Sequence, residues 1–376
     1  MAQIEMLDLK TQLLLVGPKI SEKINTVMEH GRFIMGPEVV ALEAELSQFC
    51  GVSETVTCGN GTDALQIALM AEGVGPGDAV FVPSFTFTAT AEVILVLGAV
   101  PVFCDVDPRT FNLSFASLKA AVSKVRAEGQ LRPKVVIAVD LFGLPNDYQL
   151  LRDFCILEEL FLIADAAQSF GGSEYSKRVG CLAPVTTTSF FPAKPLGCFG
   201  DGGALFTDDP IRADIYRSIR AHGKGSGKYD IVRIGMNSRL DTIQAVVLQE
   251  KLKIFEDEIL ARNRIAWIYS ERLSKWVDIP VVPENYSSAW AQYTIRSEKR
   301  DKIIDVLASQ SIPYAIYYPL PMHKQLAYRS YFSDRDEALP VSEALSNQVI
   351  SLPMHPYLTV EAVNIVCDAI ETVFQG

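Results

Sequence analysis

The sequence lacks the features that mark several large classes of protein. It contains no C-x-x-C pair, and its seven cysteines are dispersed singly along 376 residues. This pattern excludes a zinc ribbon and a thioredoxin-like pair, and it favours a reducing compartment over a secreted disulfide framework. The N-terminus, MAQIEMLDLKTQ, carries acidic residues early and has no basic segment followed by an apolar core, unlike a signal peptide. We therefore expect a cytoplasmic protein.

Long hydrophobic runs and excess positive charge are also missing. The longest apolar stretch, ILVLGAVPVF, is far shorter than the roughly 20 residues that cross a bilayer. Lysine and arginine number 34 against 45 aspartates and glutamates, and no basic run occurs. This balance argues against a nucleic-acid partner, although a local basic pocket for a small anion stays open. We expect no membrane partner, no nucleic acid and no metal site.

What is present is typical of a folded α/β protein. Hydrophobic residues make up 49% and charged residues 21% of the chain, which is long enough for two domains. From about residue 54, short β-branched runs alternate with helical stretches. In chain order these are ETVTCG, TDALQIALMAEG, DAVFVPSF, ATAEVILVLG, VPVFCDVD, KVVIAVDLFG, DYQLLRDFCILEEL and FLIADAA. The alternation predicts a mostly parallel sheet with helices on both faces.

The pattern changes after Ser238. The next 36 or so residues place apolar side chains at three- and four-residue spacing, which predicts one long helix or a bent pair. The segments AQYTIRS, KRDKIIDVLAS and IPYAIYYPLP that follow are typical of a smaller α/β unit. We therefore expect a large domain over 1–255 and a small C-terminal domain over 256–376.

Ligands of parallel sheets bind beyond the carboxyl ends of the strands, so the residues at those ends are the candidates for function. After the first strand comes GNGTDAL, where glycines and a helix N-terminus favour a phosphate. The string also fits the loose dinucleotide motif G-x-G-x-x-A. The next strand, however, ends in VPSF and lacks the acidic residue that would bind a ribose. A plain tight turn is the alternative.

Two further strand ends carry aromatic and acidic side chains. PSFTFTAT places Phe85 and Phe87 after the second strand, where each either fills the core or stacks on a planar ring. FLIADAAQSFGG places Asp165 after an apolar strand, where a carboxylate needs a cation or hydrogen-bond donors. It either caps the next turn or faces a protonated nitrogen.

The fourth strand end contains a single lysine in an apolar loop. In TSFFPAKPLGCFGDGGALFT, Lys194 follows Ser189 by five positions. A lysine that keeps its ammonium in water is the ordinary alternative. Pyridoxal phosphate, however, requires a phosphate cradle, a ring stacker, an acid for its ring nitrogen and a lysine for its aldehyde. The four strand ends together therefore predict this cofactor.

The chain resembles the DegT/DnrJ/EryC1/StrS family of sugar aminotransferases over nearly its whole length. The matching stretches are GRFIMGPEVVALEAELSQFCG, GNGTDAL, PSFTFTATAEVI, ADAAQSFG, TSFFPAKPLGCFGDGGALFT, GMNSRLDTIQAVVL and SLPMHPYL. The resemblance implies the fold of type I pyridoxal-phosphate aminotransferases, with a large domain and a smaller C-terminal α/β domain.

The resemblance also implies a role for individual residues at the cofactor ring. Lys194 would bind the cofactor aldehyde and then move a proton between substrate and cofactor. Asp165 would pair with the ring nitrogen, and Gln168 would contact the phenolic oxygen. Phe87 would stack on the ring face. Some relatives carry histidine in place of the lysine and are dehydratases, and Lys194 argues against that branch.

Phosphate and substrate residues follow from the same resemblance. Gly61, Thr62 and Ser189 would hold the phosphate, with Asn237 contributed by the other subunit of a homodimer that shares its active sites. Arg239, also from across the dimer, would reach the substrate.

Tyr317 and Tyr318 are the remaining substrate residues that the resemblance implies. Members with a related IYYPLPMHKQ segment have histidine where this chain has Tyr317. His222 and His323 lie near the expected pocket in sequence, and we expect them to be structural or rim residues.

The stretches SFFPAKPLGCFGDGGA and MNSRLDTIQA are most similar to members that aminate UDP-2-acetamido-2-deoxy-3-oxo-glucuronate. The implied partners are L-glutamate as donor and a UDP-linked keto-sugar as acceptor, and the implied pathway is synthesis of a surface polysaccharide such as O-antigen. Three alternatives stay open. They are a 4-keto-sugar aminotransferase, a regulatory relative that binds the cofactor without catalysis, and a nicotinamide-dependent oxidoreductase.

Overall fold

The structure is a computed structural model that describes residues 4–227, 229–332 and 338–375. The α-helices are α1 Leu9–His30, α2 Pro37–Cys50, α3 Gly61–Ala71, α4 Ala89–Val96, α5 Phe115–Glu128, α6 Tyr148–Leu157, α7 Pro210–Ile219, α8 Thr242–Leu252, α9 Phe255–Leu273, α10 Arg300–Ser309, α11 Pro340–Gln348 and α12 Val360–Thr372. The strands are β1 Glu54–Cys58, β2 Asp78–Pro83, β3 Val100–Cys104, β4 Arg132–Val139, β5 Phe161–Asp165, β6 Ser173–Glu174, β7 Lys177–Arg178, β8 Val185–Ser189, β9 Gly203–Thr207, β10 Tyr286–Ser287, β11 Tyr293–Arg296 and β12 Val349–Leu352. Within the described ranges, no helix combines the length and the apolar character needed to cross a membrane.

The centre of the fold is a seven-stranded sheet in the order β1-β9-β8-β5-β4-β2-β3. Strands β3, β2, β4, β5 and β8 run parallel to one another, whereas β9 is antiparallel to both of its neighbours, β8 and β1. Because β9 is antiparallel to both of these strands, β1 runs in the same direction as β8. The predicted mostly parallel sheet is confirmed, and the carboxyl ends of β1, β2, β4, β5 and β8 meet at one edge.

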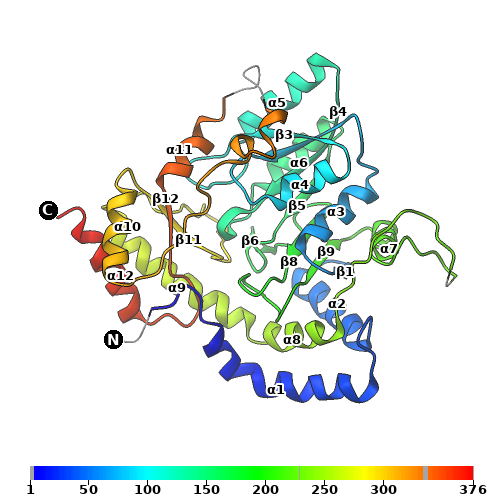
Figure 1. Cartoon of the computed structure of the whole chain (residues 1–376), viewed down its shortest axis with the longest axis horizontal. Helices are drawn as coiled ribbons and strands as arrows, with labels where there is room; N and C mark the ends of the chain where they lie inside the picture. Colours follow the sequence, from blue (N-terminus) through cyan, green and yellow to red (C-terminus); the bar gives the residue numbers. More distant parts are fainter. Residues whose placement is uncertain (1–3, 228, 333–337, 376) are drawn as a thin grey trace.

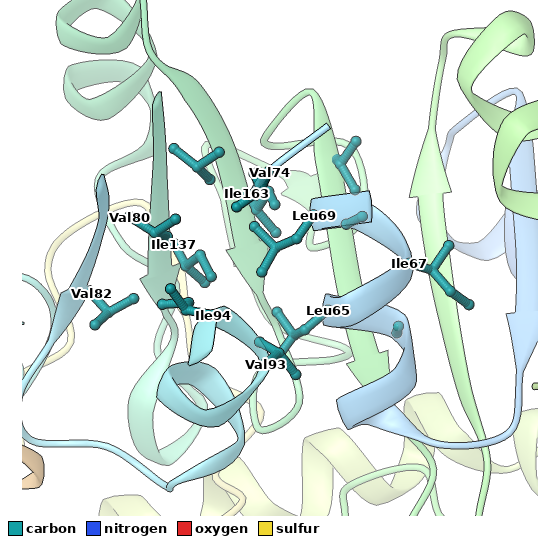
Figure 2. Close-up of a cluster of buried hydrophobic side chains, with 14 of the residues drawn as sticks. Leu65, Ile67, Leu69, Val74, Val80, Val82, Val93, Ile94, Ile137 and Ile163 are labelled. Carbon is teal, nitrogen blue, oxygen red and sulfur yellow. The ribbon is translucent and has the colours of Figure 1, made fainter. Parts of the chain in front are cut away.

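Helices α3 and α4 cover one face of this sheet. Figure 2 shows Leu65 and Leu69 of α3 packed with Ile137 and Ile163 from the strands beneath. These strands read as continuous apolar runs because both of their faces are buried, as is usual for parallel strands. The packing fixes the first turn of α3 directly after β1.

Helices α5 and α6 cover the opposite face. Leu118 of α5 and Leu151 of α6 are buried in the same cluster as Phe81 and Val136 of the sheet. The predicted arrangement, with helices on both faces, is therefore confirmed (Figure 1).

The C-terminal part has a core of its own. Strands β11 and β12 form an antiparallel pair, and Tyr293 and Ile350 from them are buried against Tyr269 of α9 and Val366 of α12. In Figure 1, α9 extends from the end of α8 towards α10 and α12.

The helical stretch after Ser238 is two helices, because α8 ends at Leu252 and α9 begins at Phe255. Phe255 and Ile259 are buried with residues of α1 and α2, whereas Ile265 belongs to the C-terminal core. The division into 1–255 and 256–376 stays our proposal, with α9 as the element that contributes to both cores.

Candidate active site

Four strand ends meet at the carboxyl edge of the sheet, and the later segment that contains Tyr318 reaches them at Gln168. The turn after β1 reaches α3, and the end of β8 at Ser189 lies beside it. Asp165 ends β5, one strand away from β8. The segment after β2 and the loop that carries Lys194 complete the edge.

The first turn of α3 is a cradle for an anion. Asn60 caps the helix, since its Oδ1 accepts a hydrogen bond of 2.8 Å from Asp63 N. Among the described residues, no acceptor is recorded for the N–H groups of Gly61 and Thr62. A Cβ on Gly61 would lie 2.6 Å from Cβ of Ser189, so only glycine allows this approach of β8. Two free N–H groups, a helix dipole and a serine hydroxyl suit a phosphate.

Asp165 is a buried carboxylate with spare hydrogen-bonding capacity. It is 6% exposed, and it accepts hydrogen bonds from Thr90 Oγ1 at 2.9 Å and from Ala167 N at 3.2 Å. Burial raises the pKa of Asp165, while these two hydrogen bonds and the charge of Lys194 lower it. A protonated nitrogen placed beside this oxygen would stabilise the ionised form.

Lys194 lies in the turn after β8, where its N–H donates to Phe191 O at 2.8 Å. Burial lowers the pKa of Lys194, and the carboxylate of Asp165 opposes that shift. The lysine and the acid therefore act on each other electrostatically, although 29 positions separate them in the sequence. A lysine with a lowered pKa is a better nucleophile and proton carrier near neutral pH.

Aromatic side chains and an amide surround this pair. Gln168 Oε1 accepts from Phe142 N at 2.6 Å, and its Nε2 donates to Tyr318 Oη at 3.3 Å. The ring centroid of Tyr318 lies 6.3 Å from that of Phe87, which is 54% exposed. Phe85, by contrast, is fully buried and fills the core.

Tyr317 lies next to this group. Its ring centroid is 5.8 Å from that of Tyr318, and it packs against the buried cluster that contains Phe85. The structure thus brings Tyr318 beside Gln168, and Tyr317 lies next to Tyr318.

Asn237 and Arg239 flank a residue that touches the turn between β1 and α3 of the same chain. Ser238 Oγ accepts a hydrogen bond of 2.9 Å from Gly59 N. Arg239 Nη2 donates to Asn237 Oδ1 at 2.5 Å, and Arg239 Nε is buried without a partner among the described residues. Their predicted contribution to the other subunit's site stays a prediction.

The histidines stand apart from this chemistry. His323 is buried, its Nδ1 lies 2.6 Å from Ser84 Oγ, and burial lowers its pKa. His222 is exposed. In the part of the chain that the structure describes, no three His, Cys, Asp or Glu side chains are grouped so that they would bind a metal ion.

Three contributors were missed by sequence reasoning. Asn60 was identifiable, because an asparagine directly before a helical run is a common cap. Thr90, which holds Asp165, lies 75 positions from it, and Asp140 reaches the end of β5 only through the sheet. No local pattern marks either residue.

The residues present fit pyridoxal phosphate by the chemistry of their donors and acceptors. The close contact between Gly61 and β8 leaves two helix N–H groups for a phosphate. Asp165 offers a buried anion for a ring nitrogen. Lys194 offers an amine within the electrostatic reach of that anion. A dinucleotide-binding oxidoreductase, the alternative function, would give this lysine no role.

Known proteins resemble the chain along its whole length. It is 44% identical to UDP-2-acetamido-2-deoxy-3-oxo-D-glucuronate aminotransferase of Pseudomonas aeruginosa, over 98% of this chain and 99% of the relative. A DegT DnrJ EryC1 StrS aminotransferase from Brucella abortus has a crystal structure that covers 100% of both chains with 48% identity and a TM-score of 0.97. NtdA from Bacillus subtilis, solved with bound cofactor PMP, is 25% identical with a TM-score of 0.89, over 100% of this chain and 86% of its own.

These similarities agree with the site. The fold matches solved aminotransferases, and the cofactor is pyridoxal phosphate, which also exists as the amine form PMP in this type of enzyme. Residues 16–371 match the family model described as the DegT/DnrJ/EryC1/StrS aminotransferase family. The chain therefore belongs to the DegT/DnrJ/EryC1/StrS aminotransferase family and is a pyridoxal-phosphate-dependent sugar aminotransferase.

Proposed function

We propose that this enzyme transfers the amino group of L-glutamate to UDP-2-acetamido-2-deoxy-3-oxo-D-glucuronate and forms the corresponding 3-amino sugar. The observation that carries aminotransfer is the convergence of three features: the buried Asp165 at the end of β5, the Lys194 loop after the neighbouring strand β8, and the first turn of α3. The choice of acceptor is supported by the similarity to the Pseudomonas aeruginosa enzyme and by Arg239 Nε, which has no partner among the described residues.

When bound, pyridoxal phosphate supplies an electron sink for the charge that develops on the carbon bearing the transferred amine. Asp165 keeps a proton on the ring nitrogen, because a buried anion stabilises a neighbouring cation. Lys194 accepts a proton from the substrate carbon and returns it on the other side of the transfer. Burial lowers the pKa of Lys194, which favours the neutral amine.

The remaining residues bind and orient. The N–H groups of Gly61 and Thr62 and the hydroxyl of Ser189 hold the phosphate, together with Asn237 of the partner subunit. Phe87, which is half exposed, would stack on the ring, and Gln168 Nε2, which donates one N–H to Tyr318 Oη, would donate its second to the phenolic oxygen.

Both substrates use one site in turn, and a carboxylate is their shared feature. Glutamate departs as 2-oxoglutarate before the keto-sugar enters. A guanidinium binds a carboxylate through two parallel hydrogen bonds, and Arg239 Nε has no partner in the part of the chain that the structure describes. A cavity of about 590 Å³ beside Phe87 and Tyr318 is large enough for a sugar nucleotide fragment. Tyr317 and Tyr318 would contact the sugar.

The shared site requires a homodimer, which the surface supports. Large apolar side chains are exposed on α1, on the segment that joins it to α2, and on the loop before Asn237. They are Leu13, Leu14, Leu15, Met28, Phe33, Ile34, Met35, Ile231, Val232 and Ile234. Such a collection is typical of an interface. Fully active monomers at high dilution would contradict the dimer.

We place the reaction in the cytoplasm, in the synthesis of a surface polysaccharide such as O-antigen. The cysteines are free thiols, as a reducing compartment requires. The 3-amino sugar would be a precursor that later transferases consume.

The first experiment uses the absorbance of the bound cofactor. Addition of glutamate should convert the chromophore to the amine form and release 2-oxoglutarate, and Lys194→Ala should lose both responses while it stays folded. A regulatory relative would leave the chromophore unchanged, and a nicotinamide enzyme would show no such chromophore. Either result would overturn the proposal.

The second experiment tests the acceptor. Arg239→Lys keeps the charge but loses the planar pair of donors. The transition-state stabilisation obtained from kcat/KM for the uronate should therefore fall by about 1 to 3 kcal/mol. For a matched acceptor with a neutral hydroxymethyl group, the same variant should show a much smaller loss of kcat/KM. Equal losses for both, in a dimeric and cofactor-loaded variant, would show that Arg239 does not bind the carboxylate. If the wild-type enzyme converted a 4-keto-sugar faster than the uronate, the proposed acceptor would be wrong.

A further inference from the structure

A second lysine is buried beneath the loop that carries Lys194. Lys251 belongs to α8, is 2% exposed, and donates a hydrogen bond of 2.7 Å from Nζ to Gly197 O. Among the described residues, this is the only hydrogen bond that the ammonium group makes. Its Nζ also lies 4.8 Å from the ring centroid of Phe199.

Gly197 is in direct contact with the chain segment that positions Lys194. A Cβ on Gly197 would lie 2.6 Å from Pro192 O and 2.7 Å from Phe191 O. Phe191 O, in turn, accepts the hydrogen bond from Lys194 N at 2.8 Å. The loop between Phe191 and Gly197 is therefore closed on itself, with Lys194 at its centre and Lys251 at its base.

Helix α8 contacts this loop from one face. Gln244 Oε1 accepts from Phe199 N at 2.8 Å, and Lys251, seven residues later, lies on the same side of the helix. Two side chains of one rigid helix thus hold the backbone that follows Lys194.

Burying an ammonium group that makes one hydrogen bond costs free energy. Burial lowers the pKa of Lys251 to about 8, while Glu258 and the Cys198 thiol oppose the shift. An apolar side chain of similar length would fill the same space without that cost. The cost is explained if the contact with Gly197 serves the position of Lys194.

We infer that Lys251 is a positioning residue for the reaction, which acts through Gly197 to hold Lys194 in place. The inference depends on the proposed role of Lys194 as the group that binds the cofactor and moves the proton. Its geometric basis is the chain of contacts from Lys251 through Gly197 and Phe191 to the Lys194 backbone.

The test is a pH titration of the chromophore that Lys194 forms with pyridoxal phosphate, in the loaded enzyme. In Lys251→Met the loop should loosen and admit water, which favours the protonated form, so the midpoint should rise by about half a pH unit or more. We expect kcat to fall about tenfold to a hundredfold because Lys194 is misplaced, with KM for glutamate almost unchanged.

Further variants keep the test decisive. Lys251→Gln, which is too short to reach Gly197 O, should shift the midpoint in the same direction, and it replaces Lys251→Met if that variant does not fold. Lys251→Arg should restore part of the wild-type midpoint. The control is Lys253→Met, since Lys253 directly follows α8, is exposed and, among the described residues, forms an ion pair with Glu250 alone.

The outcomes separate the two proposals. A wild-type protein that forms no chromophore with pyridoxal phosphate would overturn the role of Lys194 itself. A normal wild-type chromophore, together with Lys251 variants whose midpoint and kcat equal those of Lys253→Met, would overturn only the positioning role.

Discussion

Two buried carboxylates end neighbouring strands, and their surroundings differ. Asp140 follows β4 and Asp165 ends β5, and the two are joined by a hydrogen bond of 3.1 Å from Asp140 N to Asp165 O. Asp140 accepts hydrogen bonds from Asn146 N, Asn146 Nδ2, Tyr148 Oη and Ser169 Oγ at 2.6 to 2.8 Å. Asp165 accepts only from Thr90 and Ala167 among the described residues.

The difference supports a structural role for Asp140 and the proposed functional role for Asp165. Asp140 uses both oxygens to join the end of β4 to Tyr148 of α6 and to Ser169. Asp165 keeps capacity for a further donor and interacts with Lys194. Equal burial therefore does not imply equal roles, because the number of protein donors decides whether a carboxylate is available to a ligand.

Asp165→Asn should show the largest effect. The amide keeps the shape but cannot hold a proton on the ring nitrogen by charge, so kcat should fall by a factor on the order of 10²–10³. The half-reaction with glutamate, followed at the chromophore in a single turnover, measures this directly. The unfolding free energy without cofactor should stay level or rise, because a buried charge is removed. An Asp165→Asn variant with wild-type kcat would contradict the functional role proposed for Asp165.

Asp140→Asn is the matched variant and should affect stability. The amide turns an NH₂ group towards Ser169 and weakens the charged hydrogen bonds, so the unfolding free energy at pH 7 should fall by about 2 kcal/mol. Urea denaturation of both variants gives the values side by side. We expect kcat per loaded site to stay close to that of the wild type. If Asp140→Asn instead lost kcat as Asp165→Asn does, with stability unchanged, the assigned roles would be wrong.

The pH dependence of stability should give the smallest effect. Burial raises the pKa of Asp140 to about 6, while hydrogen bonds from Ser169, Asn146 and Tyr148 oppose the shift. Because the folded pKa lies above the unfolded value, the folded state binds more protons below pH 6. The contribution of Asp140 is therefore greatest at low pH and decreases as the pH rises through 6. Between pH 5 and 7 the wild type should lose about 1 kcal/mol relative to Asp140→Asn. A difference that grows with pH would contradict this assignment.

Much of the fold was predictable because it depends on local pattern. The strands β1 to β5 and the helices α3, α4 and α6 lie where the alternation of apolar and polar residues predicted them. The confirmed parallel sheet follows, since strands joined by helices pair in this way. The reversed strand β9 was not predicted, because its sequence does not record the direction in which it returns.

For the site, the sequence alone determined the residue types that the chemistry needs. An unusual lysine, an acid after an apolar strand and a glycine-rich turn each break a local expectation, and parallel strand ends must converge. These local signals are sufficient to predict that Lys194, Asp165 and Gly61 share one site.

Only the tertiary structure decided which polar groups are satisfied. Thr90 meets Asp165 across 75 residues, and Lys251 meets Gly197 across 54. Hydrogen bonds and burial depend on distances between segments far apart in the chain, and these distances exist only once the sheet and α8 are packed. A buried lysine on a helix reads in the sequence as an ordinary surface cation, and only its burial reveals a contact beneath the loop that carries Lys194.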